Sequence, residues 1–406
     1  RAVTACEYAG YPFVCVKATE VKEIDGLVVP TLEVSAGDLV RVQFLESGDP
    51  DRVSRRVLET AARFRDGRTF SPALVQTWRR NILRTAWIRP DSEQVVVGSE
   101  HQGLRFFVST DRPNQTDLAA GYAAGERQVT GHVRVRFLNL LNTCRRLGAG
   151  WQSQAGRTSY ELSYTEPWFL RSDLDVTVSA RHTTADTSYS YTEVGAGGVV
   201  CRGALEIGIE TGVDRVTGID SLSRVRTAWV GTGIGLDLRD DPRDPLRGLS
   251  VELRTRAGQR VGAGGASLVS RTETDVEVLL PVGMRTAGAV GVAARSAVAH
   301  ARLSEPELYR MGGANSLRGF REGQFVAPHL GWLNCELRFG LAAGVRVHPF
   351  FNTGIYSSGD VWRLAAGYGL GARWRTRIGR LGADYGIAVG DSPLRGKVHL
   401  SLATGF

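Results

Sequence analysis

The sequence lacks long apolar runs. Charged or polar residues interrupt every stretch well before the ~18 consecutive apolar residues that a transmembrane helix needs. Helical membrane spans are therefore excluded. A membrane β-barrel is not, because its strands alternate apolar and polar residues and never build such a run.

Cysteine is scarce, and the patterns of common enzymes are missing. The five cysteines show no C-x-x-C and no metal-type spacing to the seven histidines, and an odd number argues against a disulfide framework. The sequence contains no G-x-S-x-G, no phosphate-binding loop and no H-E-x-x-H. We therefore expect no catalytic residue, no metal and no cofactor.

Basic residues outnumber acidic ones, 50 to 42, for a formal net charge of +8. A nucleic-acid-binding protein gathers such charge in a patch or stripe, whereas these arginines are scattered along alternating segments. We therefore expect no nucleic-acid partner. Apolar residues make up 42% of the chain, which is enough for a folded core.

Helical periodicity is confined to the first 111 residues. A strand over Leu39–Phe44 comes first, with Val40, Val42 and Phe44 on one face. Ser54 and Ser71-Pro72 then open two helices, and strands near 94–97 and 104–108 follow. Residues 38–111 are thus predicted to be a small β-α-α-β-β domain.

Residues 1–37 are predicted to be the second half of the same kind of domain. They contain a helix end and a hairpin with its turn at Asp25-Gly26. Half a domain cannot bury its own sheet face, so we expect a front half upstream.

Residues 112–406 contain about sixteen short alternating segments, such as Val129–Phe137 and Leu174–Ala180. One strand with its turn takes ~18 residues, which suits a membrane barrel. Many strands carry charged or polar residues on one face and small or apolar residues on the other. A soluble sandwich or barrel is the alternative, but it would bury one face of each strand among other side chains. We therefore predict a transmembrane antiparallel β-barrel with a polar interior.

The alternation stops from about Ala301 to Pro328, where glycine, asparagine and charged residues form one long connection. Loops of this length are usually functional. Within it, Arg318 beside Gly319 presents a guanidinium fork, for which Glu336 and Asn352 on the next two strands are candidate partners. Alternate glycines at 231–235 and 367–371 are interpreted as a smooth inner wall for this loop or as thinning of the lipid face.

Several segments, in order along the chain, resemble those of one family. They are Gly10-Tyr11-Pro12-Phe13; Gly48, Gly67, Phe70 and Leu74; Tyr164–Trp168; Asp237, Arg239 and Asp240 with Pro245 and Gly248; Leu317-Arg318-Gly319-Phe320; Glu336–Phe339; Phe350–Gly354; and Asp384-Tyr385-Gly386. These segments and their order resemble those of the outer-membrane β-barrel assembly factor and bacterial surface antigen superfamily, of the BamA and TamA type. The family combines β-α-α-β-β domains, called polypeptide-transport-associated (POTRA) domains, with a sixteen-stranded barrel.

The resemblance implies a non-enzymatic function: insertion of β-barrel proteins into the bacterial outer membrane. Client strands would be captured at POTRA edges in the periplasm and templated at a barrel seam. That seam lies between the first strand, near 118–124, and the last, Lys397–Gly405. Implied partners are unfolded outer-membrane or secreted polypeptides, the lipid bilayer, and periplasmic chaperones or lipoproteins. A secretion pore of the two-partner type is the alternative, and a passive porin would leave the POTRA domains unexplained.

One position departs from the pattern of the family and another agrees with it. Asn352 stands where the family usually has aspartate, so Glu336 becomes the main charged partner expected for Arg318. Phe406 ends the last strand with an aromatic residue, as in the family's C-terminal recognition signal. It is equally consistent with a lipid-facing anchor.

Overall fold

In a computed structural model, the chain forms two compact units. Arg1–Asp111 with Asn139–Cys144 make the first, and Arg112–Leu138 with Arg145–Phe406 make the second. The structure describes residues 2–24, 27–98, 101–123, 128–154, 156–185, 188–218, 224–240, 245–342, 344–376 and 379–405. The turn predicted at Asp25-Gly26 and the residue Phe406 lie outside these ranges.

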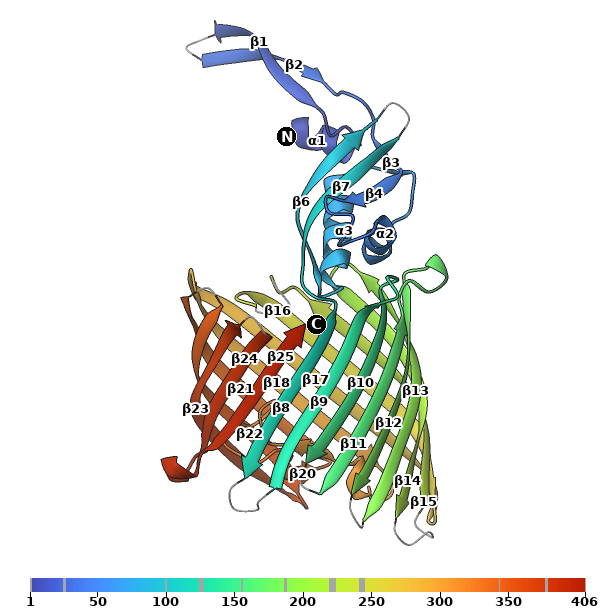
Figure 1. The fold of residues 1–406 in the computed structure, drawn as a ribbon, viewed down its shortest axis with the longest axis vertical. Helices are drawn as coiled ribbons and strands as arrows, with labels where there is room; N and C mark the ends of the chain where they lie inside the picture. The colour runs from blue at the N-terminus through green and yellow to red at the C-terminus, as the bar shows by residue number, and fades with distance from the viewer. Residues whose placement is uncertain are drawn as a thin grey trace. The chain divides into compact units, whose positions relative to one another are not determined.

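The first unit begins with helix α1 (Ala2–Tyr8) and an antiparallel strand pair, β1 (Cys15–Ile24) and β2 (Leu27–Ser35) (Figure 1). Its apolar side chains Val21, Val28, Val29, Leu32 and Val34 are exposed. The pair forms a two-stranded sheet of its own.

The rest of the first unit is a sheet covered by two helices. Its elements are β3 (Arg41–Val42), β4 (Phe44–Ser47), α2 (Arg55–Ala62), β5 (Arg68–Thr69), α3 (Pro72–Leu83), β6 (Ile88–Val97) and β7 (Gln102–Thr110). The three-stranded sheet has the order β4-β7-β6, with β4 parallel to β7 and β6 antiparallel to it.

Both helices begin where the sequence supplies a cap. The hydroxyl oxygen of Ser54 accepts from the amide of Val57 at 3.4 Å, and that of Ser71 accepts from the amide of Leu74 at 3.2 Å. The apolar faces meet the sheet in a core in which Leu45, Leu58, Ile82 and Phe106 are fully buried.

The strand predicted over Leu39–Phe44 is broken at Gln43, whose amide donates to the carbonyl of Gln102. Val40 and Val42 are buried as expected, but the next fully buried residue is Leu45, not Phe44. One interruption moves every later side chain to the other face, because strand side chains alternate with a period of two. The expected inward position of Phe44 was wrong for that reason.

The second unit is a closed antiparallel barrel of sixteen strands, which confirms that part of the predicted fold class (Figure 1). The strands are β8 (Asn114–Ala123), β9 (Gln128–Leu140), β10 (Arg145–Gln154), β11 (Arg157–Glu166), β12 (Leu174–Ala185), β13 (Tyr189–Arg202), β14 (Leu205–Gly218), β15 (Arg224–Asp237), β16 (Gly248–Gly262), β17 (Gly265–Gly283), β18 (Thr286–Ala299), β21 (His329–Ala342), β22 (Val345–Ser358), β23 (Val361–Thr376), β24 (Gly379–Ala388) and β25 (Lys397–Gly405). Single-turn helices η1 (Phe169–Arg171) and η3 (Pro393–Arg395) lie in two of the connections.

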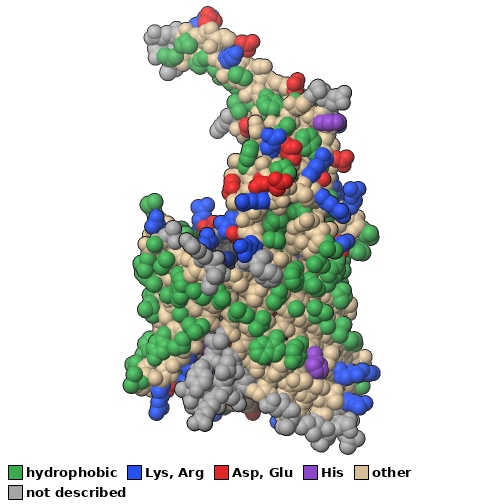
Figure 2. All heavy atoms as spheres, in the orientation of Figure 1, with side chains coloured by type: hydrophobic (Ala, Val, Ile, Leu, Met, Phe, Trp, Pro, Cys, Tyr) green, Lys and Arg blue, Asp and Glu red, His purple; other side chains and the backbone are tan. Residues whose placement is uncertain are grey.

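The alternating strands separate an apolar outer face from a polar lumen. On β14, Ile207 and Ile209 are 54% and 62% exposed on the outside. The next residue, Glu210, faces inward, and its Oε1 lies 2.7 Å from Nε of Arg256. Figure 2 shows apolar side chains distributed over the outer face of the barrel wall. Among the described residues, no helix has the length and apolar character needed to cross a membrane.

The packing of the first unit predicts a large effect for Leu58→Ala. Leu58 is fully buried, so truncation should cost about 2–5 kcal/mol of unfolding free energy through lost burial and a cavity. Leu32→Ala is the matched control, because Leu32 is 56% exposed and should change stability by less than ~0.5 kcal/mol. Hydrogen exchange of α2 and α3 in the detergent-solubilised protein measures both variants. Equal exchange in the two variants would contradict this assignment of the core.

Candidate functional site

The long connection between β18 and β21 folds as a structured loop inside the barrel. It contains the single-turn helix η2 (Glu305–Glu307) and two short paired strands, β19 (Tyr309–Met311) and β20 (Phe325–Ala327). Met311 and Leu317 of the loop are fully buried and form one apolar cluster with Leu330 of the wall. The loop therefore has a core of its own within an otherwise polar lumen.

The start of the loop is held by Glu307. Its carboxylate accepts from the guanidinium of Arg260 at 2.8 and 3.1 Å and from the amide of Ser304 at 2.7 Å. Arg271 also donates to the carbonyl of Glu307. Burial acts to raise the pKa of this carboxyl, but the bonds from Arg260 and Ser304 outweigh it and lower the pKa. The sequence analysis did not identify this anchor.

The tip of the loop is held by Arg318, which is only 4% exposed. Its Nη1 lies 2.8 Å from Oε1 of Glu336, and its Nε donates to Oδ1 of Asn352 at 3.3 Å. The guanidinium also lies over the ring of Phe350, 3.7 Å from its centre. The two residues named as candidate partners in the sequence thus meet Arg318 in the structure. A buried guanidinium needs such compensation, because an unpaired buried charge is strongly destabilising.

Glu336 also begins a chain of ion pairs that leads away from the loop. Its Oε2 lies 3.0 Å from Nε of Arg338, whose Nη2 lies 3.2 Å from Glu277. The other oxygen of Glu277 lies 3.0 Å from Nη1 of Arg239, which also pairs with Asp237 at 2.7 Å. The loop motif and the barrel motif at 237–248, quoted separately in the sequence analysis, therefore belong to one network. Glu277, which completes the link, was missed because no motif contains it.

The remaining residues of the barrel motif shape the turn after β15. Asp240 accepts from the amides of Leu246 and Arg247 at 3.1 and 3.3 Å. The carbonyl of Pro245 accepts from Arg338 at 3.4 Å. Gly248 has a φ of +120°, and a Cβ there would meet the backbone of Arg239 at 2.7 Å. The motif therefore fixes the backbone of the turn through Asp240 and ties the turn to the guanidinium of Arg338 through the carbonyl of Pro245.

Gly319 and facing glycines allow the loop tip to lie directly against the wall. Gly319 has a φ of +94°, and a Cβ there would lie 2.8 Å from the carbonyl carbon of Ile387. A Cβ at Gly386 would lie 2.5 Å from the amide nitrogen of Gly319, and one at Gly367 would strike the carbonyl of Arg318. Of the glycine stripe at 367–371, only Gly367 therefore meets the loop, whereas a Cβ at Gly369 would meet Tyr385 and Phe350 and one at Gly371 would meet Asp384 and His348. A Cβ at Gly231, in the other stripe, would instead meet Arg256 and Glu210.

A second buried polar cluster lies beside this contact. His348 is 1% exposed, and its Nε2 lies 3.1 Å from Oδ1 of Asp384. Asp384 in turn accepts from Arg373 at 2.8 and 2.6 Å. The D-Y-G segment pointed to Asp384, but nothing near His348 in the sequence distinguishes it from the other histidines.

The close approach at Gly319 predicts that Gly319→Ala releases the loop tip. Gly390 is the matched control: its φ is +93°, and a Cβ there would meet nothing within 4 Å. Both alanines carry the ~1–2 kcal/mol cost of a left-handed backbone, but only the one at 319 clashes with the wall. Faster hydrogen exchange over 312–324 in Gly319→Ala alone is the expected result. Comparable exchange in the two variants would contradict the packing of this tip.

The comparisons with known proteins agree with this architecture. The Omp85 superfamily domain matches residues 139–405. No curated protein sequence matches the chain. Among solved structures, BamA from Haemophilus ducreyi lacking POTRA domains 1–3 is similar at 15% identity and a TM-score of 0.60, covering 99% of this chain and 92% of that one.

Two structures of CdiB are also similar in fold. CdiB from Acinetobacter baumannii is 12% identical with a TM-score of 0.62, covering 97% of this chain and 78% of that one. CdiB from Escherichia coli is 15% identical with a TM-score of 0.65, covering 98% and 81%. The family match extends over most of the sixteen-stranded barrel and includes the Arg318 loop and its partners. The chain therefore belongs to the Omp85 superfamily.

Proposed function

We propose that the protein inserts and assembles β-barrel proteins in the outer membrane, using the join between β25 and β8 as the place where client strands pair. Six residue pairs, from Leu400↔Ala120 to Gly405↔Gln115, close the barrel there. Fifteen pairs join β16 to β17. Among the described pairings of the wall, this seam is the shortest, followed by the seven pairs that join β24 to β25 on its other side, and this short pairing carries the proposal.

A short seam matters because an open strand edge in lipid is costly. Each unpaired backbone group in hydrocarbon costs several kcal/mol, so opening is cheapest where the fewest ladder bonds are lost. An incoming client strand replaces the bonds that the two edges give up. The seam is therefore the natural site for exchange between self-pairing and client pairing.

The apolar outer face supports an outer-membrane location for the barrel, with apolar side chains toward lipid and charged ones in the lumen.

The β-α-α-β-β order of residues 38–111 supports the assignment of this segment as a POTRA domain in the periplasm, with residues 1–37 as part of another. The order β4-β7-β6 of the three-stranded sheet in residues 38–111 leaves β4 and β6 as edge strands. Such edges bind extended polypeptides by adding a strand.

The Arg318 loop has the role of a brace in this proposal. Its tip contacts Glu336 and Asn352 on β21 and β22 and packs against β23 and β24. In the strand order they run from β21, which belongs to the ion-pair network through Glu336 and Arg338, to β24, which neighbours β25 at the seam. By holding them, the loop keeps the wall in shape while the edges at β25 and β8 exchange partners.

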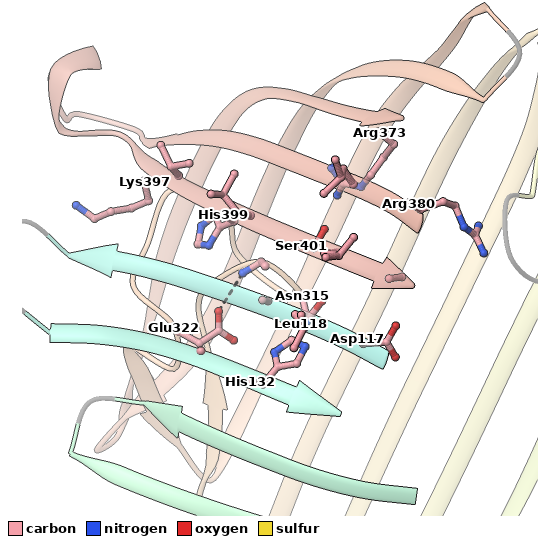
Figure 3. A pocket seen from close by; sticks show the side chains of 18 of the residues that line it. Asp117, Leu118, His132, Asn315, Glu322, Arg373, Arg380, Lys397, His399 and Ser401 are labelled. Carbon is pink, nitrogen blue, oxygen red and sulfur yellow. Dashed lines mark hydrogen bonds between the residues drawn. The ribbon is translucent and has the colours of Figure 1, made fainter. Parts of the chain in front are cut away.

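A polypeptide secretion pore of the two-partner type is the second candidate. A cavity of about 1260 Å³ inside the barrel (Figure 3) favours it, because a translocated chain needs an open path and charged side chains such as Arg134, Glu322 and Lys397 line this one. Liposomes containing the protein separate the candidates. Insertion predicts that an added unfolded eight-stranded barrel folds into the membrane, whereas a secretion pore predicts export of a partner chain without such folding.

A disulfide across the seam tests the insertion proposal. Ser401 and Ala119 are directly paired, so cysteines at both positions have suitable Cα separation. In a parent with its five native cysteines replaced by alanine, the oxidised seam should lower client insertion at least about tenfold because the edges cannot part. Reduction should restore insertion.

The control places the cysteines at Ser159 and Thr183, a direct pair inside the wall between β11 and β12. Oxidation there should leave insertion unchanged, since that pairing stays closed throughout. An oxidised seam variant that inserts clients as fast as its reduced form would overturn the proposal.

The brace role predicts that Arg318→Ala impairs client insertion while the barrel remains assembled. Removing the guanidinium leaves Glu336 buried with one partner fewer, and that loss weakens the hold on the loop tip. Arg302→Ala, at an exposed position of the same loop, is the control. Insertion rates and heat-modifiable gel migration measure function and assembly separately. Normal insertion by Arg318→Ala would refute the brace.

A further inference from the structure

Three exposed arginines, which we term the outer arginine cluster, lie near the connection between β14 and β15. Arg215 on β14 is paired directly with Arg226 on β15, and Arg224 lies two residues before Arg226 on the same strand. Directly paired side chains have Cβ atoms about 5 Å apart, and same-face neighbours on one strand lie about 7 Å apart. The three guanidinium groups can therefore reach one ligand.

Strand alternation places the outer arginine cluster on the outside of the barrel. On β15, Thr227 points inward and is 5% exposed, whereas Val230 is 49% exposed on the outside. Arg226 is an even number of residues from Val230 and so shares its face. Arg215 likewise shares the face of Val213, which is 57% exposed.

The cluster begins where an outward apolar band ends. The outward residues of β14 from Leu205 to Val213, and those of β15 from Ala228 to Leu236, are apolar or threonine, and each band extends over nine residues. A strand segment of about 9–11 residues crosses the hydrocarbon core of a membrane. The next outward residue beyond each band is an arginine. The cluster therefore lies at the border between hydrocarbon and headgroups.

The strand directions identify the end of the barrel at which the cluster lies. Neighbouring strands alternate in direction, so the connection between β14 and β15 lies at the end opposite the start of β8. With the first unit in the periplasm, as proposed above, this end belongs to the outer leaflet.

The positive charge of the cluster has no counter-charge on the described outer face. In the described part of the chain, no carboxylate forms an ion pair with these three arginines. Asp214, next to Arg215 in the sequence, points inward and lines a cavity with Arg271 and Glu307. Arginines directly opposite each other repel and destabilise a sheet. A ligand that carries negative charge would remove this repulsion.

We propose that the outer arginine cluster binds the phosphate of a lipid headgroup in the outer leaflet. The planar guanidinium donates two parallel hydrogen bonds to phosphate oxygens. The acyl chains of the same lipid would lie along the apolar bands of β14 and β15, so one ligand complements both surfaces. This inference uses the membrane location in the proposed function, but it is independent of client exchange at the seam.

The surroundings of the cluster suit a headgroup. Thr192 on β13 is directly opposite Arg215, and its Oγ1 lies 2.8 Å from Nδ1 of His182 on β12. These side chains continue the polar surface beside the arginines. Counting β8 as the first strand, β14 and β15 are the seventh and eighth of sixteen, so the site lies on the far side of the barrel from the seam. A headgroup bound there would hold that side of the wall at a fixed depth in the leaflet.

Native mass spectrometry of the detergent-solubilised protein tests the proposal with two lipids that have identical acyl chains. Phosphatidic acid presents a phosphate monoester, whereas phosphatidylcholine presents a phosphate neutralised by its own choline. We expect phosphatidic acid to be retained at least about fivefold more than phosphatidylcholine at low salt, and added salt to reduce the difference. Equal retention of the two lipids by the unmodified protein would overturn the proposal.

The variant that locates the site combines Arg215→Gln, Arg224→Gln and Arg226→Gln, and it should lose the preference for phosphatidic acid. The control removes the same charge from three exposed arginines elsewhere, at positions 41, 56 and 202, and should keep the preference. A preference that persists in the cluster variant would show that the site is wrong. Heat-modifiable gel migration reports whether the barrel has formed. If the triple variant does not form a barrel, Arg226→Gln alone, which removes the directly opposed charge, takes its place.

Inorganic phosphate distinguishes a lipid site from a site for the free anion. At equal concentration it should leave phosphatidic acid bound, because it has no acyl chains to bury against the apolar bands. Displacement of the lipid would overturn the assignment to a headgroup.

Client insertion separates this inference from the proposed function. The cluster variant should insert clients at the unmodified rate, because the seam is unchanged; slower insertion would contradict the independence of the two sites. An unmodified protein that inserts no client but prefers phosphatidic acid would refute the proposed function and support the headgroup site.

Discussion

The guanidinium of Arg318 imposes the constraint on which the site depends. A guanidinium that is only 4% exposed inside a barrel requires a carboxylate to pair with, a hydrogen-bond acceptor and a surface to pack against. Glu336 supplies the acid, Asn352 the acceptor and Phe350 an aromatic face. Glu336 is shared with Arg338, so the same requirement links the loop to Glu277 and onward through the lumen.

The barrel wall follows from a second requirement, that every strand edge find a partner. Sixteen strands meet it by closure, and the closing join between β25 and β8 has six residue pairs, against seven between β24 and β25 and fifteen between β16 and β17. The braced strands and the short join adjoin one another in strand order. In the proposed client exchange, the edges would part beside strands that the loop contacts, and residues of both regions line the lumen cavity.

Much of this could be predicted because it depends on local patterns. The period-two alternation after residue 112 predicted the barrel and its strand number, and Ser54 and Ser71 marked both helix starts through their caps. The break at Gln43 could not be seen, since nothing in the alternation of Val40, Val42 and Phe44 signals that the chain leaves one strand for another. His348 was not identified, because its burial depends on strands distant in the sequence.

The sequence by itself determined the fold class, the position of the long loop and the candidate partners of Arg318, because alternation, glycine content and charge are properties of neighbouring residues. Only the tertiary structure decided that Glu277 connects two motifs, that Glu307 anchors the loop, and that arginines from strands as distant as β9 and β24 line one cavity. Those facts depend on strand register and barrel closure. Both are set by contacts between residues far apart in the chain, which no local pattern contains.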